Sequence, residues 1–252
     1  YLGEAEGSQL DQSFQERLEE VPGISGEEKE VYLAENRRLL DAHFIPAYKK
    51  LAEGLEALKG SGTNDLGLYY YPEGRTYYEY LVEHSIYPSF TTVNELRQAV
   101  EEQLEADLDA MYSVLYRSPE LAEKFGQYSF SSEDPPVVLE SLQKAMTKDF
   151  PELPETAYRI KYVPESLEES MSPAFYLVPP MDRPQENVIY INRGSGDYDI
   201  YILLAHEGFP GHLYQNEYFR RKEAQELRYA LSFSAYAEGW GTYAENCSYL
   251  FD

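Results

Sequence analysis

The sequence predicts a mainly α-helical protein with one small antiparallel β-sheet. Apolar residues recur at steps of three and four through much of the first 150 residues, as they do along one face of a helix. After residue 150, short segments rich in β-branched and aromatic residues alternate with proline-rich turns. We therefore expect a helical region over residues 1–150 and, over residues 151–252, a small sheet followed by further helices.

Two capping boxes mark helix starts in the first region. Ser25–Glu28 and Thr92–Glu95 each place a hydroxyl three residues before a glutamate, a pattern that satisfies free N–H groups at a helix start. Apolar stripes follow over residues 40–58 and 96–115, and we expect both stripes to face a core. Pro46 should kink the first of these helices, because proline lacks an N–H group and clashes with the preceding turn.

Two or three strands are expected from the segments at residues 157–163, 174–178 and 187–192. The last of them, "NVIYIN", is a candidate edge strand against which an extended peptide could pair. Tyr190 and Asn192 are therefore candidate substrate-binding residues. Helical patterns then resume over three segments: residues 197–207, 212–227 and 233–251.

The stretch "AHEGFPGHLYQ" combines two histidines with a helix break. A zinc hydrolase needs three protein ligands and a carboxylate beside the water that the metal activates. His206 and His212 are six residues apart, so a regular helix would turn them about 120° away from each other. Gly208, Pro210 and Gly211 can break the helix and bring the second imidazole back toward the first.

The remaining groups of such a site can come from neighbouring positions. Glu207, directly after His206, is the candidate general base. In "YAEGWGTYAE", Glu238 and Glu245 are seven residues apart and can face one direction on a helix. We assign Glu238 as the third zinc ligand and Glu245 as a hydrogen-bonding partner that orients a ligand histidine, although the two could be exchanged. Gly239 and Gly241 leave room for this helix to approach the histidines.

Composition excludes several other functions. The net charge is −24, which removes most of the electrostatic attraction that nucleic-acid binding relies on. DNA and RNA are therefore poor candidate partners. The sequence also contains no run of about 20 apolar residues that could form a membrane-spanning helix.

The paired motifs "HEGFPGHLYQ" and "AEGWGTYAE" resemble the signature of the bacterial family called domain of unknown function 885, or DUF885. The segment "YYYPEGRTYYEYLVE" is similar to the middle region of that family. The resemblance implies a fold related to the gluzincin metallopeptidases, in which His206, His212 and Glu238 map onto the metal-binding positions and Glu207 onto the catalytic glutamate. Leu213 stands where many members have a further histidine.

Family members usually continue for a few hundred residues past this point. The resemblance therefore implies that the chain is an N-terminal part of a larger fold, with the rest of the polypeptide following Asp252. Many members also look like exported or lipid-anchored proteins, which slightly favours a location outside the cytoplasm.

The expected function is zinc-dependent hydrolysis of peptide bonds. Zinc would activate a water molecule and Glu207 would take its proton and pass it to the leaving group. One alternative is a non-catalytic cell-surface binding or scaffold protein with a vestigial or structural metal site. Another keeps the metal and attributes esterase or other amidase chemistry to it.

Overall fold

The chain forms two compact units in the computed structural model, residues 1–71 (unit 1) and residues 72–252 (unit 2). The structure describes these parts of the chain: residues 3–62, 64, 66–86, 89–124, 127–196, 198–222, 227, 231 and 233–251. All described strands follow residue 150, in agreement with a mainly helical protein that carries a small sheet. The domain boundary expected at residue 150 stays a prediction from composition.

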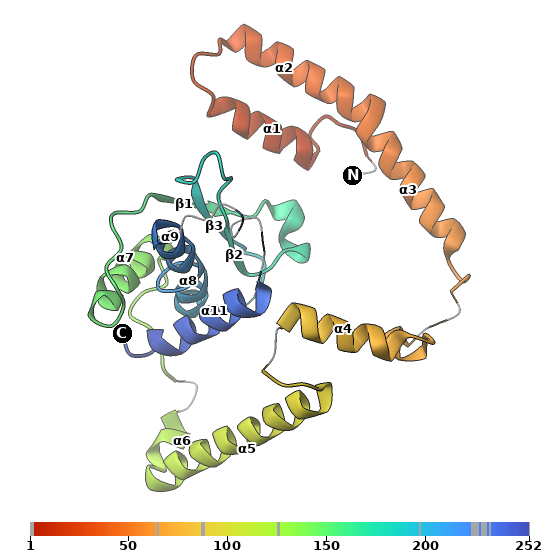
Figure 1. The fold of residues 1–252 in the computed structure, drawn as a ribbon. Helices are drawn as coiled ribbons and strands as arrows, with labels where there is room; N and C mark the ends of the chain where they lie inside the picture. Colours follow the sequence, from red (N-terminus) through yellow and green to blue (C-terminus); the bar gives the residue numbers. More distant parts are fainter. Residues whose placement is uncertain are drawn as a thin grey trace. The chain divides into compact units, whose positions relative to one another are not determined.

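Unit 1 consists of helices that follow one another closely along the chain (Figure 1). Its elements are α1 (Gln9–Glu19), α2 (Gly26–Leu39), the π-helical turn η1 (Leu40–Phe44), α3 (Ile45–Leu58) and the 3-10 turn η2 (Gly67–Tyr70). The capping box at Ser25 and Glu28 is confirmed, with both of its hydrogen bonds present. Arg37 of α2 donates to the buried carboxylate of Asp11 in α1 at 2.9 Å, which ties the two helices together.

The interruption expected at Pro46 takes the form of a π-helical turn. This turn, η1, immediately precedes α3, and Pro46 lies in the first turn of α3. Proline is tolerated there because the first N–H groups of a helix have no partner within that helix. A π turn widens the helix by one residue and so accommodates a residue that disturbs regular hydrogen bonding.

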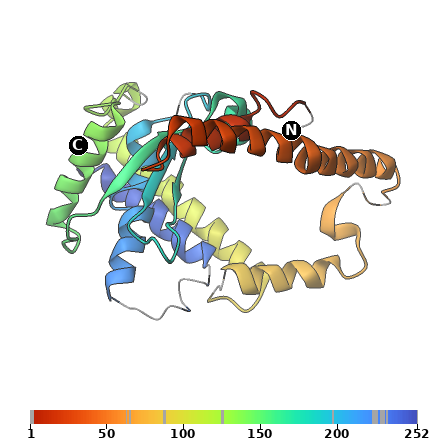
Figure 2. The ribbon, with the colours of Figure 1, turned by 90° about the horizontal axis from the view of Figure 1, so that it is seen from above.

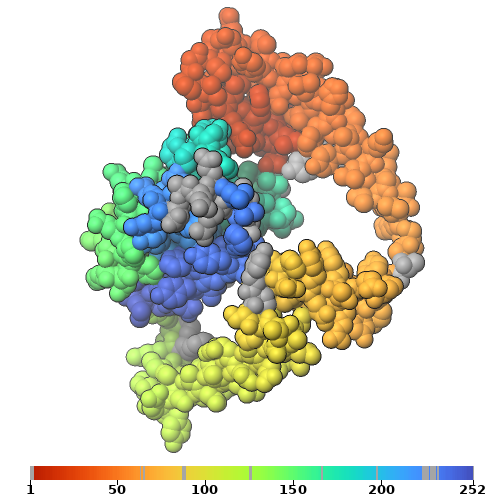
Figure 3. Space-filling view, in the orientation of Figure 1, coloured from red at the N-terminus to blue at the C-terminus, as the bar shows by residue number. Residues whose placement is uncertain are grey.

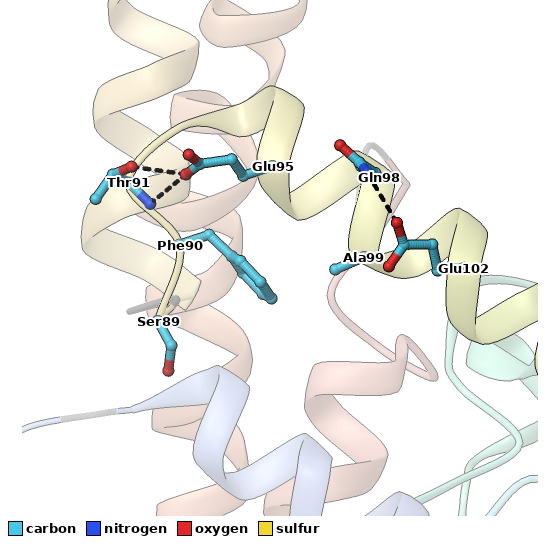
Figure 4. A pocket seen from close by; sticks show the side chains of 7 residues that line it. All are labelled: Ser89, Phe90, Thr91, Glu95, Gln98, Ala99 and Glu102. Atoms are coloured by element: carbon cyan, nitrogen blue, oxygen red, sulfur yellow. Dashed lines mark hydrogen bonds between the residues drawn. The ribbon is translucent and has the colours of Figure 1, made fainter.

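Unit 2 begins with helices α4 (Gly74–Ile86), α5 (Val93–Arg117), α6 (Glu120–Lys124), α7 (Pro135–Ala145) and the 3-10 turn η3 (Met146–Lys148). The second capping box is also confirmed, at the start of α5. Figure 4 shows the Glu95 carboxylate accepting hydrogen bonds from both the N–H and the hydroxyl of Thr91, at 2.9 and 2.6 Å. Thr92 completes the box by accepting from the N–H of Glu95.

The expectation that both apolar stripes face a core is wrong. In α3, Leu55 and Leu58 are 59% and 63% exposed, and in α5, Val100 and Leu104 are 60% and 58% exposed. Apolar periodicity reports that one face of a helix is apolar, and it does not report whether another element covers that face.

The sheet has three strands, β1 (Tyr158–Tyr162), β2 (Ala174–Leu177) and β3 (Asn187–Ile191), in the order β1-β3-β2. It is mixed and not antiparallel, because β3 pairs parallel to β1 and antiparallel to β2. The proposed edge strand "NVIYIN" is therefore the central strand, and β2 lies at an edge. The connection from β1, which includes the 3-10 turn η4 (Glu165–Ser170), is long enough to leave space for β3 between the other two strands.

Three helices follow the sheet: α8 (Ile200–Glu207), α9 (His212–Lys222) and α11 (Ser234–Ser248). They match the three expected helical segments within a few residues. Asp197, where the first segment was expected to begin, and residues 223–226 near the end of the second lie outside the described residues. Among the helices that the structure describes, none is both long and apolar enough to cross a membrane.

The core of unit 2 lies where α7, β3, α8 and α9 meet, and these elements group together in both ribbon views (Figures 1 and 2). Leu139 and Leu142 of α7, Ile189 of β3, Leu204 of α8 and Leu213 of α9 are all fully buried. The helices that carry the two histidines are therefore held by the most buried part of the unit, and this gives the site a rigid support.

We expect Leu142→Ala to lower the free energy of unfolding of unit 2 by about 2–5 kcal/mol, because it leaves a cavity in this core. Val137→Ala is the matched control on the same helix, because Val137 is 49% exposed and its truncation should cost at most about 0.5 kcal/mol. Urea unfolding can be followed through the fluorescence of Trp240, the single tryptophan of the chain. Equal unfolding midpoints for the two variants would contradict the packing described here.

Candidate metal centre

The helix break expected between the two histidines is confirmed. Helix α8 ends at Glu207 and α9 begins at His212, and the Phe209–Pro210 peptide bond between them is cis. The N–H of Tyr214 donates to the carbonyl oxygen of Gly208 at 3.2 Å, which closes the turn between the two helices.

Both glycines of this turn occupy places where a side chain would collide. A Cβ atom at Gly208 would contact Leu139 and the carbonyl oxygen of Leu204, and a Cβ at Gly211 would overlap the carbonyl oxygen of His206. Only glycine lets the chain fold back so closely on the end of α8. The turn consequently places the start of α9 beside the last turn of α8.

The two imidazoles and one carboxylate converge around a common point. The rings of His206 and His212 lie 4.5 Å apart between centroids and are almost perpendicular, at 87°. The Oε2 atom of Glu238 lies 3.5 Å from Nε2 of His206 and 3.9 Å from Nε2 of His212. Ligand atoms about 2.1 Å from a tetrahedral zinc ion lie about 3.4 Å from one another, so these separations are close to those of a zinc site.

Helix α11 approaches α8 through a glycine. A Cβ atom at Gly241 would lie 2.5 Å from Cε1 of His206, so the absence of a side chain is what allows the ring to rest on α11. This confirms the expectation for Gly241. The same expectation is wrong for Gly239, because a Cβ atom there would meet nothing within 4 Å among the described atoms. Trp240 fixes the approach by donating its indole N–H to the carbonyl oxygen of Pro210 at 2.8 Å.

Glu245 contacts the other side of the same histidine. Its Oε1 atom lies 2.6 Å from Nδ1 of His206, whereas Glu238 faces Nε2 of that ring. A carboxylate on Nδ1 fixes the orientation of the imidazole and leaves Nε2 available. The geometry thus gives the two glutamates of α11 different positions around His206.

Glu207 points toward the edge of the sheet. Its Oε2 atom accepts a hydrogen bond from the backbone N–H of Tyr176 at 2.7 Å, and one of its oxygens lies within 4.8 Å of a ring nitrogen of both His206 and His212. Burial raises the pKa of the Glu207 carboxyl above its usual range, although the Tyr176 N–H and His206 favour the charged form. Burial also lowers the pKa of His212, which favours the neutral imidazole that binds metals.

Sequence reasoning missed Tyr176 and the polar residues around it. The Tyr176 hydroxyl donates to Asn187 at 2.7 Å and accepts from Asn216 at 3.0 Å. Asn187 in turn donates to the buried carboxylate of Glu217 in α9 at 3.2 Å. This network joins β2, β3 and α9, and it fixes the strand whose N–H contacts Glu207. The buried asparagine at the start of an apolar strand was the available signal in the sequence.

The residues around the two imidazoles suit a divalent cation. Three carboxylates, those of Glu207, Glu238 and Glu245, converge on His206 and His212, and they would repel one another if all were ionised. Imidazole and carboxylate are common zinc ligands, and a bound dication would offset the excess negative charge. The donor set therefore fits zinc.

Tyr190 and Asn192, the candidate substrate-binding residues, have other neighbours. The Tyr190 ring stacks on Phe175 with centroids 5.0 Å apart. The Asn192 side chain is buried and donates to the carbonyl oxygens of Glu168 and Met171 at 2.8 and 3.0 Å. Their role toward a substrate stays a prediction.

Comparison with known proteins places the chain in a family. A search of curated protein sequences found no match. A solved structure described as "the putative lipoprotein from Colwellia psychrerythraea" has the same fold, with a TM-score of 0.77 and 20% sequence identity. The match covers 99% of this chain and 46% of that one, so this chain spans about half the length of its structural relative. The family model for bacterial proteins of unknown function DUF885 matches residues 2–248, and the chain therefore belongs to the DUF885 family.

Proposed function

We propose that this chain carries the metal centre of a zinc-dependent hydrolase that cleaves peptide bonds. The observation that carries the proposal is the convergence of His206, His212 and Glu238 across a broken helix, beside the partly buried Glu207. The glycines at positions 208, 211 and 241 allow the close approaches that this convergence requires. The likeness of this arrangement to a gluzincin site supports the same conclusion by analogy.

His206, His212 and Glu238 would hold the metal in this proposal. Glu245 would act through His206, because a carboxylate on Nδ1 keeps Nε2 directed at the cation. Zinc bound there would supply Lewis acidity, which acidifies water and polarises a carbonyl group.

Glu207 would move the proton. Its carboxylate accepts the proton from the attacking water and delivers it to the nitrogen that leaves when the amide C–N bond breaks. The raised pKa of Glu207 suits this role, because a base with a pKa nearer to neutrality also donates the proton readily. The N–H of Tyr176 would hold the carboxylate in position.

We also infer a location outside the cytoplasm. The support for it is that the structural relative from Colwellia psychrerythraea is described as a "putative lipoprotein", and lipoproteins are anchored to a membrane through an attached lipid.

Glu207→Gln is expected to retain bound zinc and to lower the rate of peptide hydrolysis by about 10²- to 10⁴-fold, because the amide cannot accept the proton. The measurement combines metal analysis of the purified full polypeptide with digestion of a peptide library. Glu101→Gln, on the exposed surface of α5, is the matched control and should hydrolyse peptides as the unaltered protein does. Undiminished hydrolysis by Glu207→Gln would refute the role of this residue.

A protein that binds zinc but cleaves neither peptides nor esters would instead support the non-catalytic binding protein. Cleavage of esters alone would assign the same centre to an esterase. These results separate the three functions that the motifs leave open.

Gly241→Ala is expected to weaken zinc binding by about 10- to 100-fold, since its Cβ would displace the His206 ring. Gly239→Ala, two residues away on the same helix, should bind zinc normally because its Cβ meets open space. Competition with a chromophoric chelator measures both affinities. Equal zinc affinities in the two variants would place the metal away from His206.

A further inference from the structure

Helix α5 presents an exposed apolar face along most of its length. None of its 25 residues is buried among the described parts of the chain, and Leu104, in the middle of the face, is 58% exposed. The face extends about 28 Å, because each residue of a helix adds about 1.5 Å. Its members are three and four positions apart, a spacing that puts them on one side of a helix: Leu96, Val100, Leu104, Leu108, Met111 and Leu115.

The segment that precedes α5 contacts a different side of the helix. Phe90 lines a pocket together with Ala99 and Glu102 (Figure 4). Ala99 and Glu102 lie about 140° and 160° around the helix from Leu104, because each residue turns a helix by about 100°. The contacts that the structure describes at this end of α5 therefore leave the apolar face open.

An open apolar face of this length is unusual in a folded protein. Contiguous exposed apolar surface typically marks a place where another protein surface packs. Helices in proteins also gain most of their stability from such packing and little from the helix itself. The amphipathic pattern of α5 is thus typical of a helix that packs against a further element.

The structural relative is long enough to supply that element from its own chain. It shares the fold of this chain with a TM-score of 0.77, and the match covers 99% of this chain, so α5 belongs to the shared fold. The match covers only 46% of the relative, and more than half of that chain therefore lies outside it. A helix on the surface of one half can pack against the other half.

Charge disfavours a second copy of this chain on the apolar face. The sequence of α5 contains six acidic and two basic residues, and Glu105 and Asp107 border the face on opposite sides. Two copies packed face to face would bring these borders together, and each copy has a net charge of −24. A segment of the same polypeptide is also favoured because a covalent tether gives it a high effective concentration.

We infer that the apolar face of α5 packs against a part of the same polypeptide that lies outside residues 1–252. The occupant is an amphipathic helix, because residues at steps of three and four form ridges that fit the grooves of another helix. Lys or Arg residues of that helix lie opposite Glu105 and Asp107, where they complement the acidic borders. The inference goes beyond the proposed function, since α5 contributes no residue to the candidate metal centre.

Thiol labelling of the complete gene product tests whether the face is covered. Leu104→Cys should react with iodoacetamide at least tenfold more slowly than Ala106→Cys, which is exposed on the opposite side of α5. Peptide mass spectrometry separates both positions from the native Cys247. Met111→Cys, on the same face as Leu104, repeats the measurement if Leu104→Cys does not fold. Equal rates on the two sides of the helix overturn the inference.

Photo-crosslinking of the complete gene product identifies the occupant. Benzoylphenylalanine in place of Leu104 should cross-link mainly to a peptide outside residues 1–252, and in a mixture of ¹⁴N- and ¹⁵N-labelled protein both linked peptides should carry one isotope. Benzoylphenylalanine in place of Ala106 should give at least tenfold less of this product.

Three other results overturn the inference. Mixed-isotope products would assign the face to a second copy, and products mainly within residues 1–252 would assign it to an element of this chain. A gene product with no residues beyond these 252 would lack the occupant altogether. Neither labelling nor cross-linking involves zinc or hydrolysis, so both outcomes are independent of the proposed function.

Discussion

The close return of the chain at Gly211 onto the end of α8 is the constraint on which the rest of the centre depends. On one continuous helix, two imidazoles six residues apart would face directions about 120° apart. The absence of a Cβ at Gly211 permits this return, and the buried core beneath α8 and α9 holds it. Gly241 in α11 also lacks a Cβ, and this lets the His206 ring lie against that helix.

This geometry concentrates carboxyl groups around two imidazole rings. Three glutamates from two helices approach His206, each from a different direction, and each has its own contact: Tyr176 for Glu207, the two Nε2 atoms for Glu238 and Nδ1 for Glu245. Such a cluster is electrostatically unfavourable by itself. A dication at its centre would turn mutual repulsion into attraction, which is why the arrangement is more typical of a metal site than of a structural helix pair.

Much of this centre could be predicted from the sequence, because glycine and proline report backbone geometry directly. The turn at residues 208–211 and the spacing of Glu238 and Glu245 depend on local rules of helix geometry. The order of the strands could not be predicted, because the pattern of apolar and polar residues identifies a strand but does not show which strands it pairs with. The exposure of the apolar faces of α3 and α5 could not be predicted either, because it depends on whether another element packs against each helix.

The contact of Glu207 with Tyr176 shows why the backbone partner of Glu207 could not be assigned from the sequence. The donor is a backbone N–H, which nineteen of the twenty amino acids would supply in the same place. Another residue at position 176 would therefore keep the N–H that donates to Glu207, provided that the strand keeps its path. Proline is the one replacement that would remove this donor, and it would also remove the hydroxyl that joins Asn187 and Asn216.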